Sequence, residues 1–267
     1  MVRCIVIGAA GRMGARIIDA IHHTEGVQLV GATECKGHQR IGTDAGEFSG
    51  IGKTGITIVD NLDSMSSECD VLIDFTAPAS SLNTLEWAAS RKKAVVIGTT
   101  GFSSQHTERI REMAQKIPCV FAPNMSVGIN LLFKLISQAA HILKDDYDIE
   151  VLESHHRLKK DAPSGTAMKI AQILAETLKR NLDQVAIHQR KGLIGERSRE
   201  EIGIQVIRAG DIVGDHTVLF AGAGERLEIT HRAHSRDTFA RGAVRAAQWV
   251  VAQKPGLYTM QDVLGFH

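Results

Sequence analysis

The sequence predicts an α/β protein with two domains, a parallel sheet covered by helices on both faces and a second domain of the α+β class. Two observations favour the first domain. A glycine-rich turn joins an apolar strand to a helix near the N-terminus, and apolar runs then alternate with helical patterns as far as residue 122. After that the alternation stops. Between residues 147 and 232 several strand-like segments accompany one long helix, which is typical of a separate α+β domain.

The N-terminal strand leads into a turn that suits a dinucleotide. Residues 4–7 are apolar, residues 8–14 spell GAAGRMG, and a helical pattern follows. Glycines permit a tight turn and close approach of the backbone to a pyrophosphate, which the helix N-terminus then holds. Residues 27–32 predict a second strand, and Glu34 ends it at the position where an acid typically binds the adenine ribose. The alternative is a glycine-rich turn in another α/β fold.

The rest of this sheet follows in order. Residues 71–75, 94–98 and 119–122 predict buried strands, separated by helices over residues 78–91 and 104–116. Each strand ends in small or polar residues, and ligands of open parallel sheets bind at the carboxyl ends of the strands. We therefore expect the loops at residues 76–78, 98–101 and 122–125 to line the nicotinamide side, although residues 98–101 could form only a tight turn.

The second domain begins with a helix that Asn124 or Ser126 could cap, whose apolar stripe includes Ile129 and Ile136. Strands are expected over residues 147–157, 202–208, 215–221 and 226–230. Residues 190–201 are polar, contain glycine and lack periodicity, which predicts a mobile loop. Ser235 or Asp237 is expected to cap a final helix.

The segment ESHHRLKKDAPSGTA, residues 153–167, combines histidines and cations with the start of a helix. Alternation places Glu153, His155 and Arg157 on one face of a strand, and Ser154 and His156 on the other. The two histidines therefore need not share a role.

A helix of about 14 residues follows from Gly165, and its first turn has no carboxylate. Its free N–H groups, the Thr166 hydroxyl and the ammonium groups of Lys159 and Lys160 predict a pocket for an anionic substrate. A solvated basic loop capped by Ser164 is the alternative. We expect no metal site, because neighbouring histidines on a strand point to opposite faces and no further ligands follow at suitable spacing.

Length, charge and cysteine usage set further bounds. The chain has 267 residues and a net charge of +1, which argues against a nucleic acid as principal partner. No apolar run approaches the roughly 18 residues of a membrane span, and no signal peptide precedes the first strand, so we expect a cytoplasmic protein without a membrane partner. Its cysteines, Cys4, Cys35, Cys69 and Cys119, show no paired spacing and are expected to be reduced.

Seven motifs together resemble the 4-hydroxy-tetrahydrodipicolinate reductase family, and in order they cover nearly the whole chain: GAAGRMG, DFTAPAS, GTTGF, APNMSVGIN, ESHHRLKKDAPSGTA, RAGDIVGDHTVLFAG and ITHRAHSR. The resemblance implies a Rossmann-like nucleotide domain of residues 1–126 that residues 237–267 rejoin. It also implies an inserted mixed-sheet α+β domain, residues 127–236, that binds substrate and forms a homotetramer. The implied reaction is reduction of a cyclic dicarboxylate by NADH or NADPH with loss of water.

The resemblance also implies roles for individual residues. His155 is similar to the family's proton donor or acceptor and Lys159 to its proton donor, although which of them delivers the proton stays open. His156, Gly165 and Thr166 match the substrate-binding groups. The nucleotide-contacting segments correspond to Gly8, Ala9, Ala10, Gly11, Arg12, Met13, Glu34, Gly98, Thr99, Thr100, Ala122, Pro123, Asn124 and Met125.

The preference between NADH and NADPH stays open too. Glu34 favours the free ribose hydroxyls of NAD, whereas Arg12 or Lys36 could pair with the 2′-phosphate of NADP. Some family members have Arg directly after the acid, but this chain has Cys35 followed by Lys36. Two other functions remain as alternatives: a related amino-acid or semialdehyde dehydrogenase, and a non-catalytic regulator that senses the nucleotide.

Overall fold

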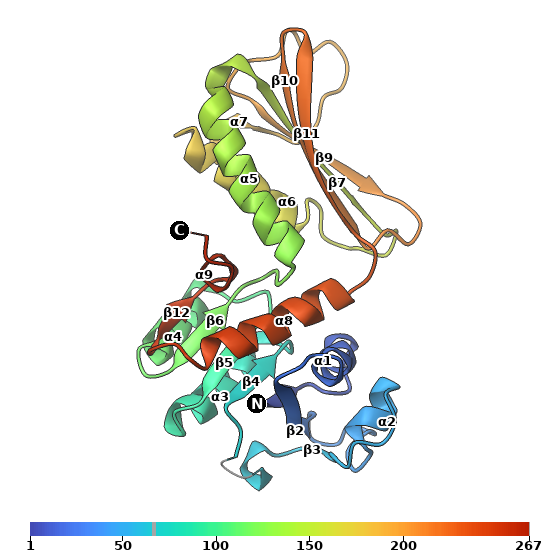
Figure 1. Ribbon diagram of the computed structural model, residues 1–267. Coiled ribbons are helices and arrows are strands. Elements are labelled where there is room, and N and C mark those ends of the chain that lie inside the picture. The colour runs from blue at the N-terminus through green and yellow to red at the C-terminus, as the bar shows by residue number, and fades with distance from the viewer. Residues whose placement is uncertain (66–67, 267) are drawn as a thin grey trace. The chain divides into compact units, whose positions relative to one another are not determined.

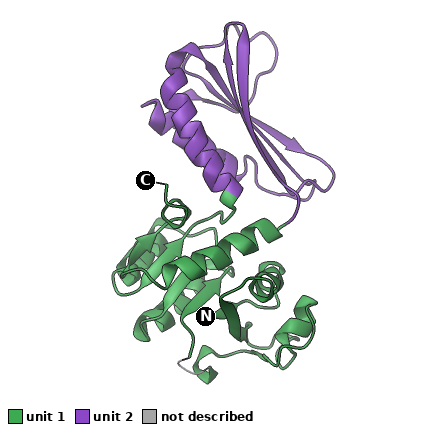
Figure 2. Cartoon of the chain, viewed as in Figure 1, with its two compact units in different colours: residues 1–127, 236–267 green, residues 128–235 purple. Residues whose placement is uncertain are grey.

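The computed structural model describes residues 1–65 and 68–266, and the chain divides into two compact units. Unit 1 combines residues 1–127 with residues 236–267, and unit 2 consists of residues 128–235 (Figure 2). The boundaries expected at residues 126 and 237 each lie one residue away from these.

Within the described residues, unit 1 is built on a seven-stranded sheet in the order β12-β6-β5-β4-β1-β2-β3, in which every neighbouring pair is parallel (Figure 1). The predicted Rossmann-like parallel sheet is confirmed. Because β2 and β4 flank β1 on opposite sides, the strand order reverses there, and such a switch point is where open α/β sheets bind ligands. The strands are β1 (Val2–Ile7), β2 (Val27–Thr33), β3 (Ile58–Val59), β4 (Val71–Asp74), β5 (Ala94–Ile97), β6 (Pro118–Phe121) and β12 (Gly256–Tyr258).

Helices cover both faces of this sheet, which explains why its strands are mostly apolar. In β1, Cys4 and Val6 join the core formed with α1 and α8, whereas Ile5 and Ile7 join the core formed with α3 and α4. The helices of unit 1 are α1 (Arg12–His22), α2 (Ala45–Ser49), α3 (Pro78–Ser90), α4 (Ser104–Ala114), α8 (Asp237–Val250) and α9 (Met260–Val263), with a 3-10 turn η1 (Leu62–Ser64).

The structure corrects the expected start of the last long helix. Helix α8 begins at Asp237 and its N-cap position is Arg236, so neither Ser235 nor Asp237 occupies the cap. The short elements α2, β3, η1, β12 and α9 were not predicted, because two to five residues carry too little periodicity to be recognised. Strand β12 pairs with β6 and returns the C-terminal segment to the sheet of unit 1.

Unit 2 contains a mixed sheet, which over the described residues has five strands in the order β11-β10-β7-β9-β8. Strand β10 is antiparallel to both β7 and β11, whereas β7, β9 and β8 are parallel. The predicted α+β class is confirmed. The strands are β7 (Asp148–His155), β8 (Ala186–Ile187), β9 (Ile202–Arg208), β10 (Gly214–Gly222) and β11 (Glu225–Ala233).

In the part of unit 2 that is described, the α-helices pack on one face of the sheet (Figure 1). Ile149 and Val151 from β7 and Val218 and Phe220 from β10 form a core with them. The helices are α5 (Val127–Leu143), α6 (Gly165–Thr177) and α7 (Leu182–Val185), with a 3-10 turn η2 (Lys144–Asp146) after α5.

The loop over residues 190–201 has no helix or strand, as predicted, but ion pairs hold it to the sheet. Arg190 contacts Glu150 at 2.8 Å and Glu201 at 3.1 Å. Arg197 contacts Asp148 at 2.8 Å and Glu150 at 3.3 Å. These contacts give no support to the expectation that the loop is mobile.

All four cysteines are free thiols, with Cys4, Cys69 and Cys119 buried and Cys35 exposed. Burial raises the pKa of Cys4 and of Cys119 to about 12, so both act as inert core residues. Among the residues described, no helix is long and apolar enough to cross a membrane.

Candidate active site

The glycine turn between β1 and α1 is held by Glu34, which follows β2. The Ala10 N–H donates to Glu34 Oε2 at 3.1 Å, and the Cys35 N–H donates to Glu34 Oε1 at 2.8 Å. Gly8 adopts a φ of 70°, a conformation that favours glycine. The structure therefore brings together the predicted turn and the predicted ribose acid. Arg12 and Lys36, the two candidates for a 2′-phosphate, are exposed.

The three other loops expected to line the nucleotide, residues 76–78, 98–101 and 122–125, follow the neighbouring strands β4, β5 and β6. Strands β5 and β6 are joined at their carboxyl ends. The Ala122 N–H donates to Ile97 O at 3.1 Å, which ties the two strand ends together. Thr100 and Pro123 are exposed, whereas the Met125 side chain is 1% exposed and belongs to the core. Asn124 Oδ1 accepts from the Ser126 N–H at 2.9 Å. Because its side chain is buried in the core, Met125 could contact a ligand only through its backbone.

In unit 2, Glu153 lies at the centre of a buried hydrogen-bond cluster. Its carboxylate is fully buried and accepts from both Nη atoms of Arg208, at 2.8 and 2.9 Å. It also lies 2.6 Å from His155 Nδ1 and accepts from the Ser164 N–H at 2.9 Å. Burial alone would raise the pKa of Glu153, but these hydrogen bonds outweigh it and hold the pKa below its ordinary value.

This cluster fixes the chemical state of His155. Because an ionised carboxylate only accepts, Nδ1 of His155 carries the proton that faces Glu153, and the lone pair lies on Nε2. Burial lowers the pKa of His155, although Glu153 opposes the shift. The ring packs edge to face against His216, 5.2 Å between centroids. Burial lowers the pKa of His216 to about 3, so both imidazoles are neutral near pH 7.

The basic loop after β7 contains one cation in a different environment from the others. The Lys159 side chain is 20% exposed and its Nζ lies 2.9 Å from the carboxylate of Asp161, whereas Arg157 and Lys160 are exposed. Arg208 reaches the same loop, since its Nη2 donates to Asp161 O at 2.7 Å. The alternative of a solvated basic loop therefore fits Arg157 and Lys160 but not Lys159.

Helix α6 begins beside the cluster, as predicted. Ser164 Oγ accepts from the Ala167 N–H at 3.1 Å and contacts His216 Nε2 at 3.2 Å. No acidic residue occupies the first turn. Gly165 is exposed, and no atom lies within 4 Å of where its Cβ would be. The N-terminus of α6 is thus capped by Ser164 and open to a ligand at Gly165.

The structure revises two placements on this strand. Strand β7 ends at His155, so Arg157 does not continue its face, as was expected, but lies in a turn where its N–H donates to Gly210 O at 3.2 Å. His156 also follows the strand, is partly exposed, and has a buried Nδ1 without a hydrogen-bond partner among the described residues.

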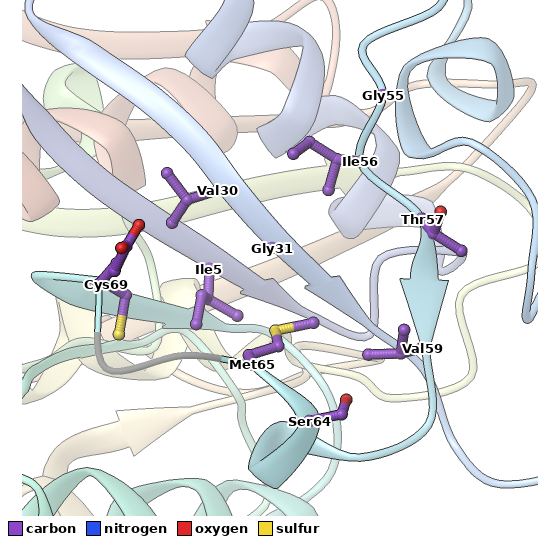
Figure 3. A pocket seen from close by; sticks show the side chains of 11 residues that line it. Ile5, Val30, Gly31, Gly55, Ile56, Thr57, Val59, Ser64, Met65 and Cys69 are labelled. Atoms are coloured by element: carbon purple, nitrogen blue, oxygen red, sulfur yellow. The ribbon is translucent and has the colours of Figure 1, made fainter.

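A cavity of about 380 Å³ lies elsewhere in unit 1, among side chains of β1, β2 and β3 (Figure 3). Its lining includes Ile5, Val30 and Met65 and contains none of the predicted site residues. We therefore do not assign the chemistry to it.

Comparison with known proteins agrees with this geometry. The N-terminal model of dihydrodipicolinate reductase matches residues 2–125, and the C-terminal model of the same family matches residues 128–264. The chain belongs to the dihydrodipicolinate reductase family. The resemblance that the seven motifs indicated is confirmed.

Individual members of the family match along the full chain. The 4-hydroxy-tetrahydrodipicolinate reductase of Syntrophus aciditrophicus is 60% identical over 100% of this chain and 99% of its own length. That of Geotalea uraniireducens is 56% identical over 99% of each chain. A solved dipicolinate-bound dihydrodipicolinate reductase from Paenisporosarcina has a TM-score of 0.78 and 25% identity over 98% of both chains.

Sequence reasoning missed two members of the site in unit 2. Arg208 ends β9, and His216 lies in β10. Each carries a weak signal, because a charged or imidazole side chain interrupts a segment that is otherwise apolar or alternating. Their partners come from distant parts of the chain, so the signal does not identify a role.

We predict that Arg208→Leu destabilises unit 2, because Glu153 would remain buried without its cation. The free energy of unfolding should fall by about 3–5 kcal/mol, measured by urea denaturation at pH 7. The pKa of Glu153 is lowered in the folded protein, so its ionised carboxylate stabilises the fold at pH values above the ordinary glutamate pKa. This stabilisation is lost as the pH falls through the folded pKa. In the variant, the free energy of unfolding should therefore depend less on pH in the acid range.

Arg226→Leu is the matched control, because Arg226 pairs with Glu228 at 2.8 Å on the surface. It should change the free energy of unfolding by less than about 1 kcal/mol. Equal effects of the two substitutions would contradict the central role given to the Glu153–Arg208 pair.

Proposed function

We propose that this chain catalyses the NAD(P)H-dependent reduction of 4-hydroxy-tetrahydrodipicolinate to tetrahydrodipicolinate with loss of water, in lysine and diaminopimelate synthesis. The observation that carries the proposal is His155, oriented by Glu153 at the end of β7, directly before the loop that carries Lys159 and leads to the open start of α6. Membership of the dihydrodipicolinate reductase family supports it. The dipicolinate named for the solved relative is also a cyclic dicarboxylate.

In this proposal unit 1 binds the nucleotide, which supplies the hydride when bound. The positive φ of Gly8 and the first turn of α1, which has no acidic residue, suit a pyrophosphate. Glu34 would bind the adenine ribose, and residues 98–100 and 122–125 would contact the nicotinamide side. Either NADH or NADPH fits these groups.

Unit 2 would bind the dicarboxylate. The backbone N–H groups at Gly165 and Thr166 offer donors for one carboxylate, with His156 as a further binding group. Lys159 adds a positive charge that can neutralise the negative charge developing on the ring. The Asp161 carboxylate that pairs with Lys159 is 62% exposed, so a substrate carboxylate can replace it at small cost.

The lowered pKa of His155 supports Lys159 as the proton donor. After hydride addition the ring carries an enamine-like anion that must be protonated, and a neutral imidazole with its lone pair on Nε2 is an acceptor. The Lys159 ammonium can donate directly. In the elimination that precedes hydride addition, His155 Nε2 would accept a proton from the ring carbon next to the one that bears the hydroxyl group and return it to the departing hydroxide, which leaves as water.

A coupled assay tests the function. The protein is mixed with a dihydrodipicolinate synthase, pyruvate and aspartate semialdehyde, and the absorbance of NADH or NADPH is followed. Oxidation that requires all components supports the proposal. Binding of the nucleotide without turnover would favour a regulator, and turnover with another amino acid or semialdehyde would favour a related dehydrogenase.

We also infer a cytoplasmic homotetramer. Helices cover one face of the unit 2 sheet within the described residues, and we infer that other copies of the chain pack on the opposite face. The free thiols suit a reducing compartment. A molecular mass in solution that differs from the mass of four chains would contradict the homotetramer.

We predict that Lys159→Ala lowers kcat by roughly 10²-fold, the usual scale for loss of a general acid, while NADPH binding is retained. Steady-state kinetics and a fluorescence titration with NADPH measure the two effects. Lys160→Ala, on the exposed neighbouring residue, should leave kcat within about two-fold. Near-normal turnover of the Lys159 variant would place this lysine outside the chemistry.

We predict that Lys36→Ala raises the KM for NADPH more than the KM for NADH, because only NADPH has a 2′-phosphate for the ammonium to bind. The ratio of the two KM values is the quantity to compare, with Lys53→Ala as an exposed lysine control. Equal changes for the two cofactors would remove Lys36 from phosphate recognition and leave Arg12 as the candidate.

A further inference from the structure

The segment Asp74-Phe75-Thr76, at the carboxyl end of β4, lies between two of the loops to which we assign the nucleotide. Strand β4 pairs with β1 on one side and with β5 on the other. A Cβ on Gly8 would lie 2.6 Å from Thr76 Cγ2, and a Cβ on Gly98 would lie 2.1 Å from the Phe75 ring. Each glycine is therefore packed directly against this segment.

Asp74 connects these parts through one carboxylate oxygen. It is fully buried, and its Oδ1 accepts from the Thr76 N–H at 2.9 Å, the Thr76 hydroxyl at 2.6 Å and the Ser81 hydroxyl at 2.9 Å. Ser81 Oγ in turn lies 2.8 Å from Thr99 Oγ1, and the Thr99 hydroxyl is itself 3.4 Å from Asp74 Oδ1. The network thus joins the end of β4, the first turn of α3 and the loop after β5.

The second oxygen, Asp74 Oδ2, is buried and has no hydrogen-bond partner among the described residues. No basic group bonds to Oδ1 in the contacts above, in contrast to Glu153. Asp74 therefore acts in this network as an acceptor at Oδ1, a task that an amide oxygen in the same place could also perform.

Thr99 therefore has a structural role in the loop after β5. Its side chain is 3% exposed and is directed into the network, so it can offer a ligand only its backbone, whereas the Thr100 side chain is exposed. The hydroxyl of Thr99 serves to hold the loop in place.

We propose that Asp74, acting directly and through Ser81, is a positioning residue that holds Thr76 and Thr99 in place and so preorganises the nucleotide loops at Gly8 and Gly98. The inference rests on the proposed function, since it assigns these loops to NADPH. A loop ordered before binding does not lose its conformational freedom on binding, so breaking the network weakens the nucleotide complex without removing any group that touches it.

Ser81→Ala tests the link to Thr99, and Thr84→Ala is its control one turn later on α3. Both residues are at most 2% exposed, but the Thr84 hydroxyl donates to Ser80 O at 3.1 Å, a bond within α3 itself. Ser81→Ala should weaken NADPH binding about 10-fold, the scale of one hydrogen bond, and Thr84→Ala by less than about two-fold. Fluorescence titration gives the Kd, and urea denaturation gives the stability of each variant.

A kinetic comparison separates positioning from stability. Loss of folded protein would lower the apparent kcat and leave KM unchanged, whereas displaced loops should raise the KM for NADPH about 10-fold and leave the KM for the dicarboxylate unchanged. The inference would be overturned if wild type and Ser81→Ala had the same KM for NADPH. It would also be overturned if Ser81→Ala and Thr84→Ala lost the same NADPH affinity.

Asp74→Asn and Asp74→Ala test the acceptor itself. Asn preserves an oxygen at the Oδ1 position and should bind NADPH within about three-fold of wild type, whereas Ala should bind at least about 10-fold more weakly. An equal loss of NADPH affinity in the Asn and Ala variants would overturn the role of Asp74 as an acceptor. If Asp74→Ala does not fold, the comparison of Ser81→Ala with Thr84→Ala decides. A wild-type protein that binds neither NADH nor NADPH would reject the proposed function, whereas wild type and Ser81→Ala that bind the nucleotide equally well would reject only this inference.

Discussion

The arrangement of unit 2 depends on the buried carboxylate of Glu153 and its paired hydrogen bonds with Arg208. A carboxylate without exposure to water is costly unless a cation and further donors satisfy it. Here the guanidinium, His155 and the Ser164 N–H do so together. Because Arg208 also donates to Asp161 O, this pair fixes the histidine before the basic loop, the loop itself and the helix that follows it.

This cluster also separates the charges of the site. His155 and His216 are kept neutral by burial, although a carboxylate lies beside them, whereas Lys159 keeps a partner on the surface at Asp161. A neutral imidazole with an orienting carboxylate suits proton acceptance, and an ammonium suits donation and neutralisation of charge. The two roles thus follow from different degrees of burial along one segment of the chain.

How much could be predicted from the sequence depended on the range of each interaction. The period of two along β7 placed Glu153 and His155 on one face, and the helical period predicted α6 with its Ser164 cap, because both patterns are local. The contacts of His155 with His216 and of Glu153 with Arg208 require the pairing of β7 with β10 and β9, which no local pattern specifies. Strands of two or three residues, such as β3 and β12, lie below the length at which periodicity is visible.

Glu153 and Asp74 are both buried carboxylates that order nearby loops, but different groups satisfy their oxygen atoms. Each is a buried carboxylate near the carboxyl end of a strand, and each collects loops from neighbouring elements. Glu153 forms an ion pair, so its charge is neutralised where we propose that a dicarboxylate binds, and the substrate meets the field of Lys159 rather than an uncompensated anion. At Asp74 the loops are ordered instead by the Thr76 N–H and by the hydroxyls of Thr76 and Ser81. The two carboxylates thus order their loops with different partners, an ion pair at Glu153 and neutral hydroxyl and amide donors at Asp74.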